Sequence, residues 1–137
     1  MSFIRNNIGL IGLAIGSAGM LLWPWLRSKS RNIPELSPGM AVLLINRESP
    51  LVLDVRDEKE FVEGHLPEAK NIPLDVLDKR LADIEAWKDK PVLVNCKSGA
   101  RSESACNLLH RQGFTKLNNL AGGITAWQSA KLPVSKD

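Results

Sequence analysis

The fold is decided by the stretch VLVNCKSGARS, residues 92–102. Val92–Val94 is a short aliphatic run typical of a buried strand, and residues 101–112 have the apolar spacing of a helix that ends at Gly113. A strand that passes through a tight loop directly into a helix is the repeating unit of a parallel sheet. The inward face of this helix is predicted to hold Ala105, Leu108 and Leu109.

Strands alternate with helices on both sides of this stretch. Further strands are predicted at residues 51–53 and 117–120. The pair Ser37-Pro38 fits the cap and first position of a helix, and one or two helical turns are expected over residues 58–63. The alternation, with continuous apolar strands, predicts an α/β domain with a parallel sheet and helices on both faces. A further helix is predicted from the apolar stripe Leu74, Leu77, Leu81, Ile84 and Trp87, and the helix after Ser37 from Met40, Leu43 and Leu44.

The N-terminus has a different character from the rest of the chain. Residues 8–26 are apolar or small apart from Ser17 and Pro24, and a helix of this length rises about 28 Å, close to the hydrocarbon thickness of a bilayer. Trp23 and Trp25 precede the basic residues at 27, 29 and 31, as is typical where a helix leaves the membrane. We therefore predict a retained transmembrane anchor with a basic flank, residues 1–30, rather than a cleaved signal peptide.

The excess of basic residues after the span predicts a single-pass protein whose C-terminal domain is cytoplasmic. A tether over residues 28–38 would lead from the anchor into the soluble domain, residues 31–137, whose folded part begins near Ile33. Lipid is then an expected partner, and a membrane-protein partner is a further possibility. The spacing of Gly12 and Gly16 suits close packing of two helices, so self-association through the anchor is a weaker expectation.

Composition and charge exclude several classes of function. The chain has 137 residues, enough for one core, and is 44% hydrophobic. The first 31 residues hold four basic side chains and no acidic one, whereas residues 32–137 hold 14 basic and 15 acidic side chains. The soluble part therefore lacks the basic face that nucleic acid requires. With two cysteines, two histidines and no CxxC pair, no metal site is expected.

Cys96 directly follows a predicted strand, a position where ligands and catalytic residues are expected in a parallel α/β fold. Ligands bind beyond the carboxyl ends of parallel strands, and the amides and dipole of a helix start favour negative charge. A cysteine at this position should ionise easily, and the thiolate is the nucleophilic form. Lys97 and Arg101 add positive charge, and Gly99 can adopt the positive φ of a ring-like loop.

Three segments resemble the rhodanese family of sulfurtransferases. They are LDVRDEKEFVEGHLPEAKNIPL at residues 53–74, CKSGARS at residues 96–102 and GFTKLNNLAGGITAW at residues 113–127. The resemblance extends from about Ile33 to Val134, and the family often has glycine where this chain has Glu68.

The resemblance implies a rhodanese-like fold and a Cys96 persulfide. The persulfide would carry sulfane sulfur from a small anionic donor, such as thiosulfate, to a thiol or cyanide acceptor, with no cofactor. The resemblance also implies that the amides of residues 97–102 hold the sulfur and the donor, with Arg101 supplying charge. The residues assigned to this anion site are Lys97, Ser98, Gly99, Ala100, Arg101 and Ser102.

Two other functions are compatible with the sequence. One is a non-catalytic, tethered binding or adaptor module. The other is phosphatase or arsenate chemistry, which is disfavoured because four residues separate Cys96 from Arg101, whereas similar phosphatases have five.

Other polar residues are given supporting roles. Asp54 and Arg56 are expected to organise the loop after their strand by ion pairing. Cys106 is expected to pack in the core rather than act as a resolving thiol, and His65 to be structural. Trp87 and Trp127 are interpreted as core aromatic residues. The acidic run Asp57, Glu58, Glu60 and Glu63 is interpreted as solvated helix surface.

Overall fold

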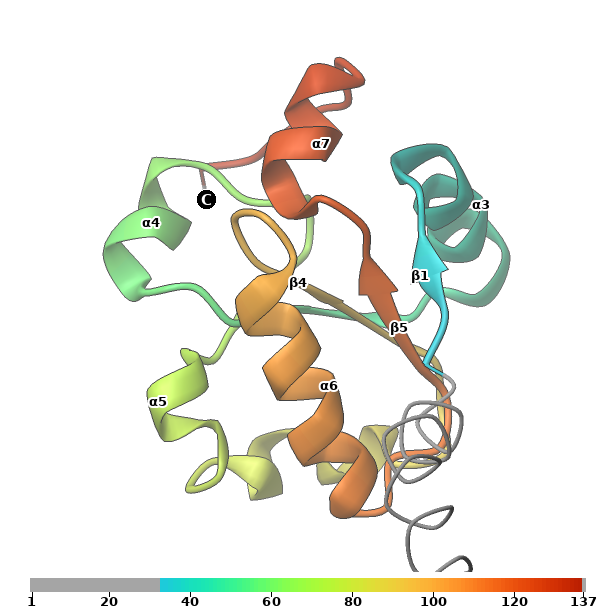
Figure 1. Ribbon diagram of the computed structural model, residues 1–137, viewed down its shortest axis with the longest axis vertical. Coiled ribbons are helices and arrows are strands. Elements are labelled where there is room, and N and C mark those ends of the chain that lie inside the picture. Colours follow the sequence, from blue (N-terminus) through green and yellow to red (C-terminus); the bar gives the residue numbers. More distant parts are fainter. Residues whose placement is uncertain (1–32, 137) are drawn as a thin grey trace, which may run out of the picture. The chain divides into compact units, whose positions relative to one another are not determined.

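The computed structural model describes residues 33–136. They form a five-stranded parallel sheet with the order β1-β5-β4-β2-β3, covered by helices on both faces (Figure 1). The α/β fold with a parallel sheet predicted from the sequence is thereby confirmed. The strands are β1 (Glu35–Leu36), β2 (Leu51–Asp54), β3 (Lys70–Asn71), β4 (Val92–Asn95) and β5 (Leu117–Leu120). The helices are α3 (Pro38–Glu48), α4 (Glu58–Glu63), α5 (Leu74–Leu77), η1 (Leu81–Trp87), α6 (Ala100–Arg111) and α7 (Gly123–Ser129).

The predicted membrane anchor, residues 1–30, lies outside the described residues and stays a prediction. Within residues 33–136, no helix has the length and hydropathy needed to cross a bilayer.

Each face of the sheet has its own apolar core, because successive residues of a strand point to opposite faces. On β2, Leu51 and Leu53 face the core under α5 and α6, while Val52 faces the core under α3 and α7. On β4, Val92 and Val94 contribute to the first core and Leu93 to the second. The first three residues of each of these central strands are therefore apolar because both faces are buried, and each strand ends in a buried polar residue, Asp54 or Asn95.

The helix predicted after Ser37 is α3, and its cap is the expected one. The Ser37 hydroxyl accepts a hydrogen bond from the Met40 amide at 3.3 Å, and Pro38 occupies the first turn. Ala41 is the buried residue of this helix, whereas Met40 and Leu43 are 53% and 44% exposed.

The single helix predicted from the stripe at residues 74–87 is wrong. The segment forms two pieces, the short helix α5 and the 3₁₀ helix η1. The interruption comes at Arg80, whose φ of −118° and ψ of 21° are not helical. Leu81, Ile84 and Trp87 are spaced by three, which aligns them on one side of a 3₁₀ helix, so the apolar stripe continues across the interruption.

The predicted tether over residues 28–38 is wrong in its last part, which contains the edge strand β1. Glu35 and Leu36 pair with Asn119 and Leu120 of β5. The opposite edge strand, β3, was also not predicted. Both strands have two residues, which is too short for a periodic pattern, and their pairing partners are distant in sequence.

The C-terminal segment after α7 folds back onto the domain. The indole nitrogen of Trp127 donates to the carbonyl of Pro133 at 2.8 Å, and Ser135 pairs with His65 through two backbone hydrogen bonds of 2.9 and 2.7 Å. Trp127 is a buried core residue as expected, while Trp87 is half-buried and packs at the edge of the core under α6.

Helix α7 begins directly against the loop that follows β4. The amide of Ile124 donates to the Cys96 carbonyl at 2.8 Å, and the amide of Thr125 donates to the Lys97 carbonyl at 3.1 Å. Gly123 makes this approach possible, because it has φ 60° and a Cβ there would collide with the Cys96 carbonyl oxygen and lie 2.7 Å from the Lys97 carbonyl carbon.

The substitution Gly123→Ala is therefore expected to lower the free energy of unfolding by about 2 kcal/mol, through backbone strain and overpacking. Urea unfolding measures this loss. Gly39→Ala in α3 is the matched control, because Gly39 has open space around it and alanine favours a helix. Equal stability of Gly123→Ala and the unmodified protein would contradict the close approach.

Candidate active site

Cys96 follows β4 directly, and a tight loop carries the chain from it into α6. The side chain is 1% exposed. Gly99, the residue before α6, has φ 108°, the positive φ expected of it. The loop therefore curls around the sulfur and closes at the N-terminus of a helix, where unpaired amides favour negative charge.

Hydrogen-bond donors surround the sulfur of Cys96. The Gly99 amide donates to Sγ at 3.0 Å, and the Ser102 hydroxyl oxygen lies 3.4 Å from Sγ. Burial raises the pKa of Cys96, but hydrogen bonds from the Ser102 side chain and from the amides of Ser102, Gly99 and Ser98 outweigh burial, so the pKa is lowered overall. The arrangement favours a buried thiolate.

The Ser102 hydroxyl lies within hydrogen-bond distance of three groups. Besides Sγ, these are the Gly99 carbonyl at 3.0 Å and the Asn119 side-chain oxygen at 2.6 Å. A hydroxyl has one proton to donate. Donation to the ionised sulfur therefore requires that the Asn119 amide present its nitrogen to Ser102 instead of its oxygen. Asn119 is buried on β5, so the neighbouring strand supports the site.

The residues predicted to hold an anion do not all point to the sulfur. Among the side chains of the loop and the first turn of α6, that of Ser102 contacts Sγ, while Lys97, Ser98 and Ala100 are exposed. The loop therefore acts on the sulfur through the Ser102 side chain and through the amides of Ser102, Gly99 and Ser98.

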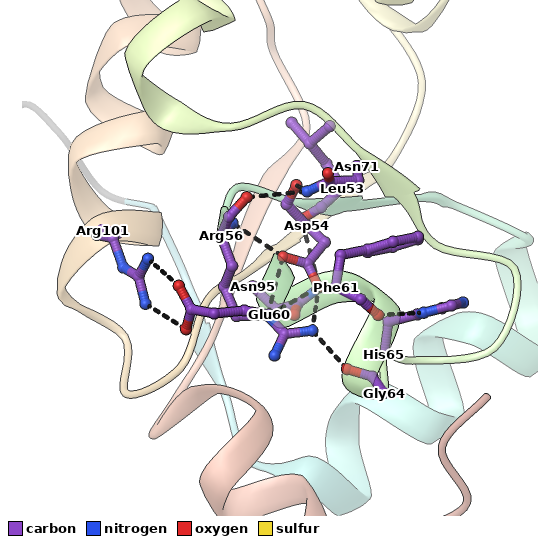
Figure 2. A network of polar contacts seen from close by, with 10 residues as sticks. All are labelled: Leu53, Asp54, Arg56, Glu60, Phe61, Gly64, His65, Asn71, Asn95 and Arg101. Atoms are coloured by element: carbon purple, nitrogen blue, oxygen red, sulfur yellow. Dashed lines mark hydrogen bonds and ion pairs between the residues drawn. The ribbon is translucent and has the colours of Figure 1, made fainter. Parts of the chain in front are cut away.

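That Arg101 supplies charge to the loop stays a prediction, because its guanidinium is also bound by a carboxylate from another helix. Its guanidinium makes a two-pronged ion pair with the Glu60 carboxylate, with distances of 2.7 and 3.0 Å (Figure 2). This pair corrects the interpretation of the acidic run as uniformly solvated surface. Glu60 lies on the side of α4 that faces α6, whereas Asp57, Glu58 and Glu63 are exposed.

Asp54 and Arg56 form a buried ion pair after β2. The closest distance is 2.8 Å, between the Arg56 Nη2 and the Asp54 Oδ2, and the same nitrogen donates to the Gly64 carbonyl at 2.7 Å (Figure 2). The Asn71 side chain donates to the carbonyls of Asp54 and Arg56. These contacts join the end of β2 to β3 and to the end of α4.

Cys106 and His65, the two remaining residues considered from the sequence, are both buried in the fold. Cys106 is buried on α6, and burial raises its pKa to about 12, with the charges of Glu103 and Cys96 adding to the rise. His65 stacks on the ring of Phe61, and its Nδ1 lies 2.9 Å from the Phe61 carbonyl oxygen.

Sequence reasoning missed three features of the site: Asn119, the Glu60–Arg101 pair, and the contact of α7 with the loop. The two adjacent glycines at 122 and 123, directly after a strand, were a usable signal for a close backbone approach. The other two depend on side chains brought together from distant parts of the chain, for which the sequence carries no local pattern.

A family model and a curated relative both indicate the same protein family. The family model of the rhodanese-like domain matches residues 37–130. A sulfurtransferase of Allochromatium vinosum is 37% identical over 98 residues, which are 72% of this chain and 90% of the relative.

Solved structures agree in fold. A rhodanese-related protein from Thermoplasma volcanium has a TM-score of 0.69 at 28% identity, over 76% of this chain and 99% of that protein. A thiosulfate sulfurtransferase from Pseudomonas aeruginosa has a TM-score of 0.66 at 29% identity, over 77% of this chain and 20% of that protein. The chain therefore belongs to the rhodanese-like domain family.

Proposed function

We propose that this protein is a sulfurtransferase in which Cys96 carries the sulfur. The observation that carries the proposal is the buried Cys96 sulfur, which accepts a hydrogen bond from the Gly99 amide and lies 3.4 Å from the Ser102 hydroxyl oxygen. A nucleophile that is already ionised needs no general base, and none of the neighbouring residues has to remove a proton. The sulfurtransferase relatives support the same assignment.

The reaction proceeds in two displacements. With thiosulfate as donor, the Cys96 thiolate attacks the outer sulfur, the S–S bond breaks, and sulfite leaves with the electron pair. The enzyme is left with a persulfide anion on Cys96. Cyanide or a thiolate acceptor then attacks the outer persulfide sulfur, the new S–S bond breaks, and the Cys96 thiolate is regenerated. The donor amides around the loop can stabilise negative charge on either sulfur.

Replacement of Cys96 by serine is expected to abolish sulfur transfer, because an un-ionised hydroxyl cannot attack sulfane sulfur at neutral pH. Intact mass after incubation with thiosulfate should show an added 32 Da, the mass of one sulfur atom, in the unmodified protein and none in Cys96→Ser. Cyanide should remove the added mass. Cys106→Ser is the control and should keep both the adduct and the activity. An adduct that persists in Cys96→Ser would overturn the assignment.

Removal of the Ser102 hydroxyl is expected to raise the pKa of Cys96, because it removes the strongest of the interactions that lower this pKa. In the unmodified protein, the rate of iodoacetamide alkylation should reach half its maximum below about pH 8.5, the value for a free thiol. In Ser102→Ala this midpoint should rise by about one pH unit, so that alkylation at pH 7 is slower.

Ser104→Ala, on the exposed side of the same helix, should leave the alkylation midpoint unchanged. Cys106, with a pKa of about 12, stays protonated over the same pH range. An identical profile in Ser102→Ala and the unmodified protein would show that the hydroxyl does not stabilise the thiolate.

We also propose that residues 8–26 anchor the protein in a membrane, with the described domain on the cytoplasmic side. Their uninterrupted apolar character and the basic residues that follow support this. In sealed, right-side-out vesicles, external protease should leave the domain intact until the vesicles are opened with detergent. Digestion of the domain before detergent is added would contradict the orientation, and recovery of the protein away from the vesicles would contradict the anchor.

A further inference from the structure

A pocket of about 280 Å³ lies beside the loop, between α4 and α7. It borders the loop at Lys97, and four charged side chains line it. Two are cations and two are carboxylates, so the lining is balanced in charge. They are Arg56, Lys97, Glu60 and Glu63.

The two arginines near this pocket are each held by a carboxylate. Arg56 is bound by the buried Asp54, with 2.8 Å as the closest distance. Two nitrogens of Arg101 donate hydrogen bonds to the two carboxylate oxygens of Glu60. This edge of the guanidinium is therefore occupied and cannot bind a second planar anion. Among the described residues, Lys97 is then the one cation of the pocket with no ion pair, and Glu63 adds a negative charge to the same lining.

Arg101 is nevertheless near the reacting sulfur, because it lies in the first turn of α6 next to Ser102, whose hydroxyl oxygen is 3.4 Å from Sγ. Its pKa is raised first by the hydrogen bonds to Glu60, and the charge of Cys96 also raises it. The Arg101 side chain is 35% exposed and that of Glu60 28%, so the pair is accessible to a ligand that approaches the loop. A change in the charge of this pair would therefore be felt by an anionic donor.

We propose that Glu60 sets the donor preference of the site by neutralising Arg101, so that donors with little negative charge are favoured over the thiosulfate dianion. The favoured class contains organic persulfides and monoanionic thiosulfonates. Glu60 acts through Arg101 and does not touch the reacting sulfur. The inference rests on the proposed sulfur transfer, and it assigns that same site a substrate class.

Sulfur transfer from a favoured donor follows the same displacement as transfer from thiosulfate. With methanethiosulfonate, the Cys96 thiolate attacks the terminal sulfur, the S–S bond breaks, and methanesulfinate leaves with the electron pair. One negative charge enters with the donor and one leaves with the sulfinate. With an organic persulfide, a thiolate leaves instead.

A first experiment needs no turnover. Iodoacetate and iodoacetamide both alkylate the Cys96 thiolate, are similar in size, and differ by one negative charge. The ratio of their rates therefore reports the electrostatic environment of the sulfur, and any change in the pKa of Cys96 cancels in it. In Glu60→Gln at low ionic strength we expect this ratio to rise about fivefold, and the rise to shrink with added salt.

Two further variants make the alkylation test specific. Glu58→Gln removes an exposed carboxylate from the same helix and should leave the ratio within about twofold of the unmodified protein, as expected for a solvated charge. The double variant Glu60→Gln/Arg101→Gln should return to the ratio of the unmodified protein. An unchanged ratio in Glu60→Gln, or a rise that persists in the double variant, would overturn the inference.

A second experiment separates this inference from the proposed function. The kcat/KM for thiosulfate divided by that for methanethiosulfonate should rise about fivefold in Glu60→Gln. If the unmodified protein takes sulfur from neither donor, the proposed function fails, while the alkylation ratio still tests the role of Glu60. If it takes sulfur from both and Glu60→Gln leaves their ratio unchanged, sulfur transfer stands and the donor preference set by Glu60 is wrong.

Discussion

The Cys96 sulfur is buried, and its surroundings lower its pKa although burial by itself would raise it. Burial alone disfavours a charged thiolate, so the fold has to supply donors that replace water. The Gly99 amide at 3.0 Å does so, together with other amides of the loop, and the Ser102 hydroxyl oxygen lies 3.4 Å from the sulfur. These donors cost no rearrangement during a reaction because the sheet and two helices already hold them in place.

The donors are held by elements that are far apart in sequence. Helix α6 supplies Ser102, the neighbouring strand β5 supplies Asn119 behind it, and α7 binds the loop carbonyls from the other side. The sheet order places β4 between β5 and β2, so the loop after β4 has support from both neighbours. The central position of β4 thus lets elements on both sides of it contact one short loop.

The elements that show a pattern within a few consecutive residues could be predicted from the sequence. Those that depend on contacts between residues far apart in the chain could not. The strands at 51–53 and 92–94 are continuous aliphatic runs, so their burial could be predicted from composition alone, and 117–120 has leucine at both ends. The edge strands β1 and β3 could not be predicted, because two residues show no periodicity. For the site, Cys96 and Gly99 stood out at a strand-to-helix junction, whereas the partner of Arg101 lies 41 residues away in sequence. Glu68 shows a third case: it stands where the resemblance implies glycine, and its φ of 63° lies in the region that favours glycine.

The two cysteines of the domain differ greatly in acidity, since the environment of Cys96 lowers its pKa and that of Cys106 raises its pKa to about 12. One equivalent of a small thiol-directed reporter, applied near neutral pH, would therefore react at the buried sulfur of the loop and spare the helix. The unmodified sequence thus accepts a spectroscopic reporter at one defined position, which makes motions of the loop measurable without first engineering a single-cysteine background.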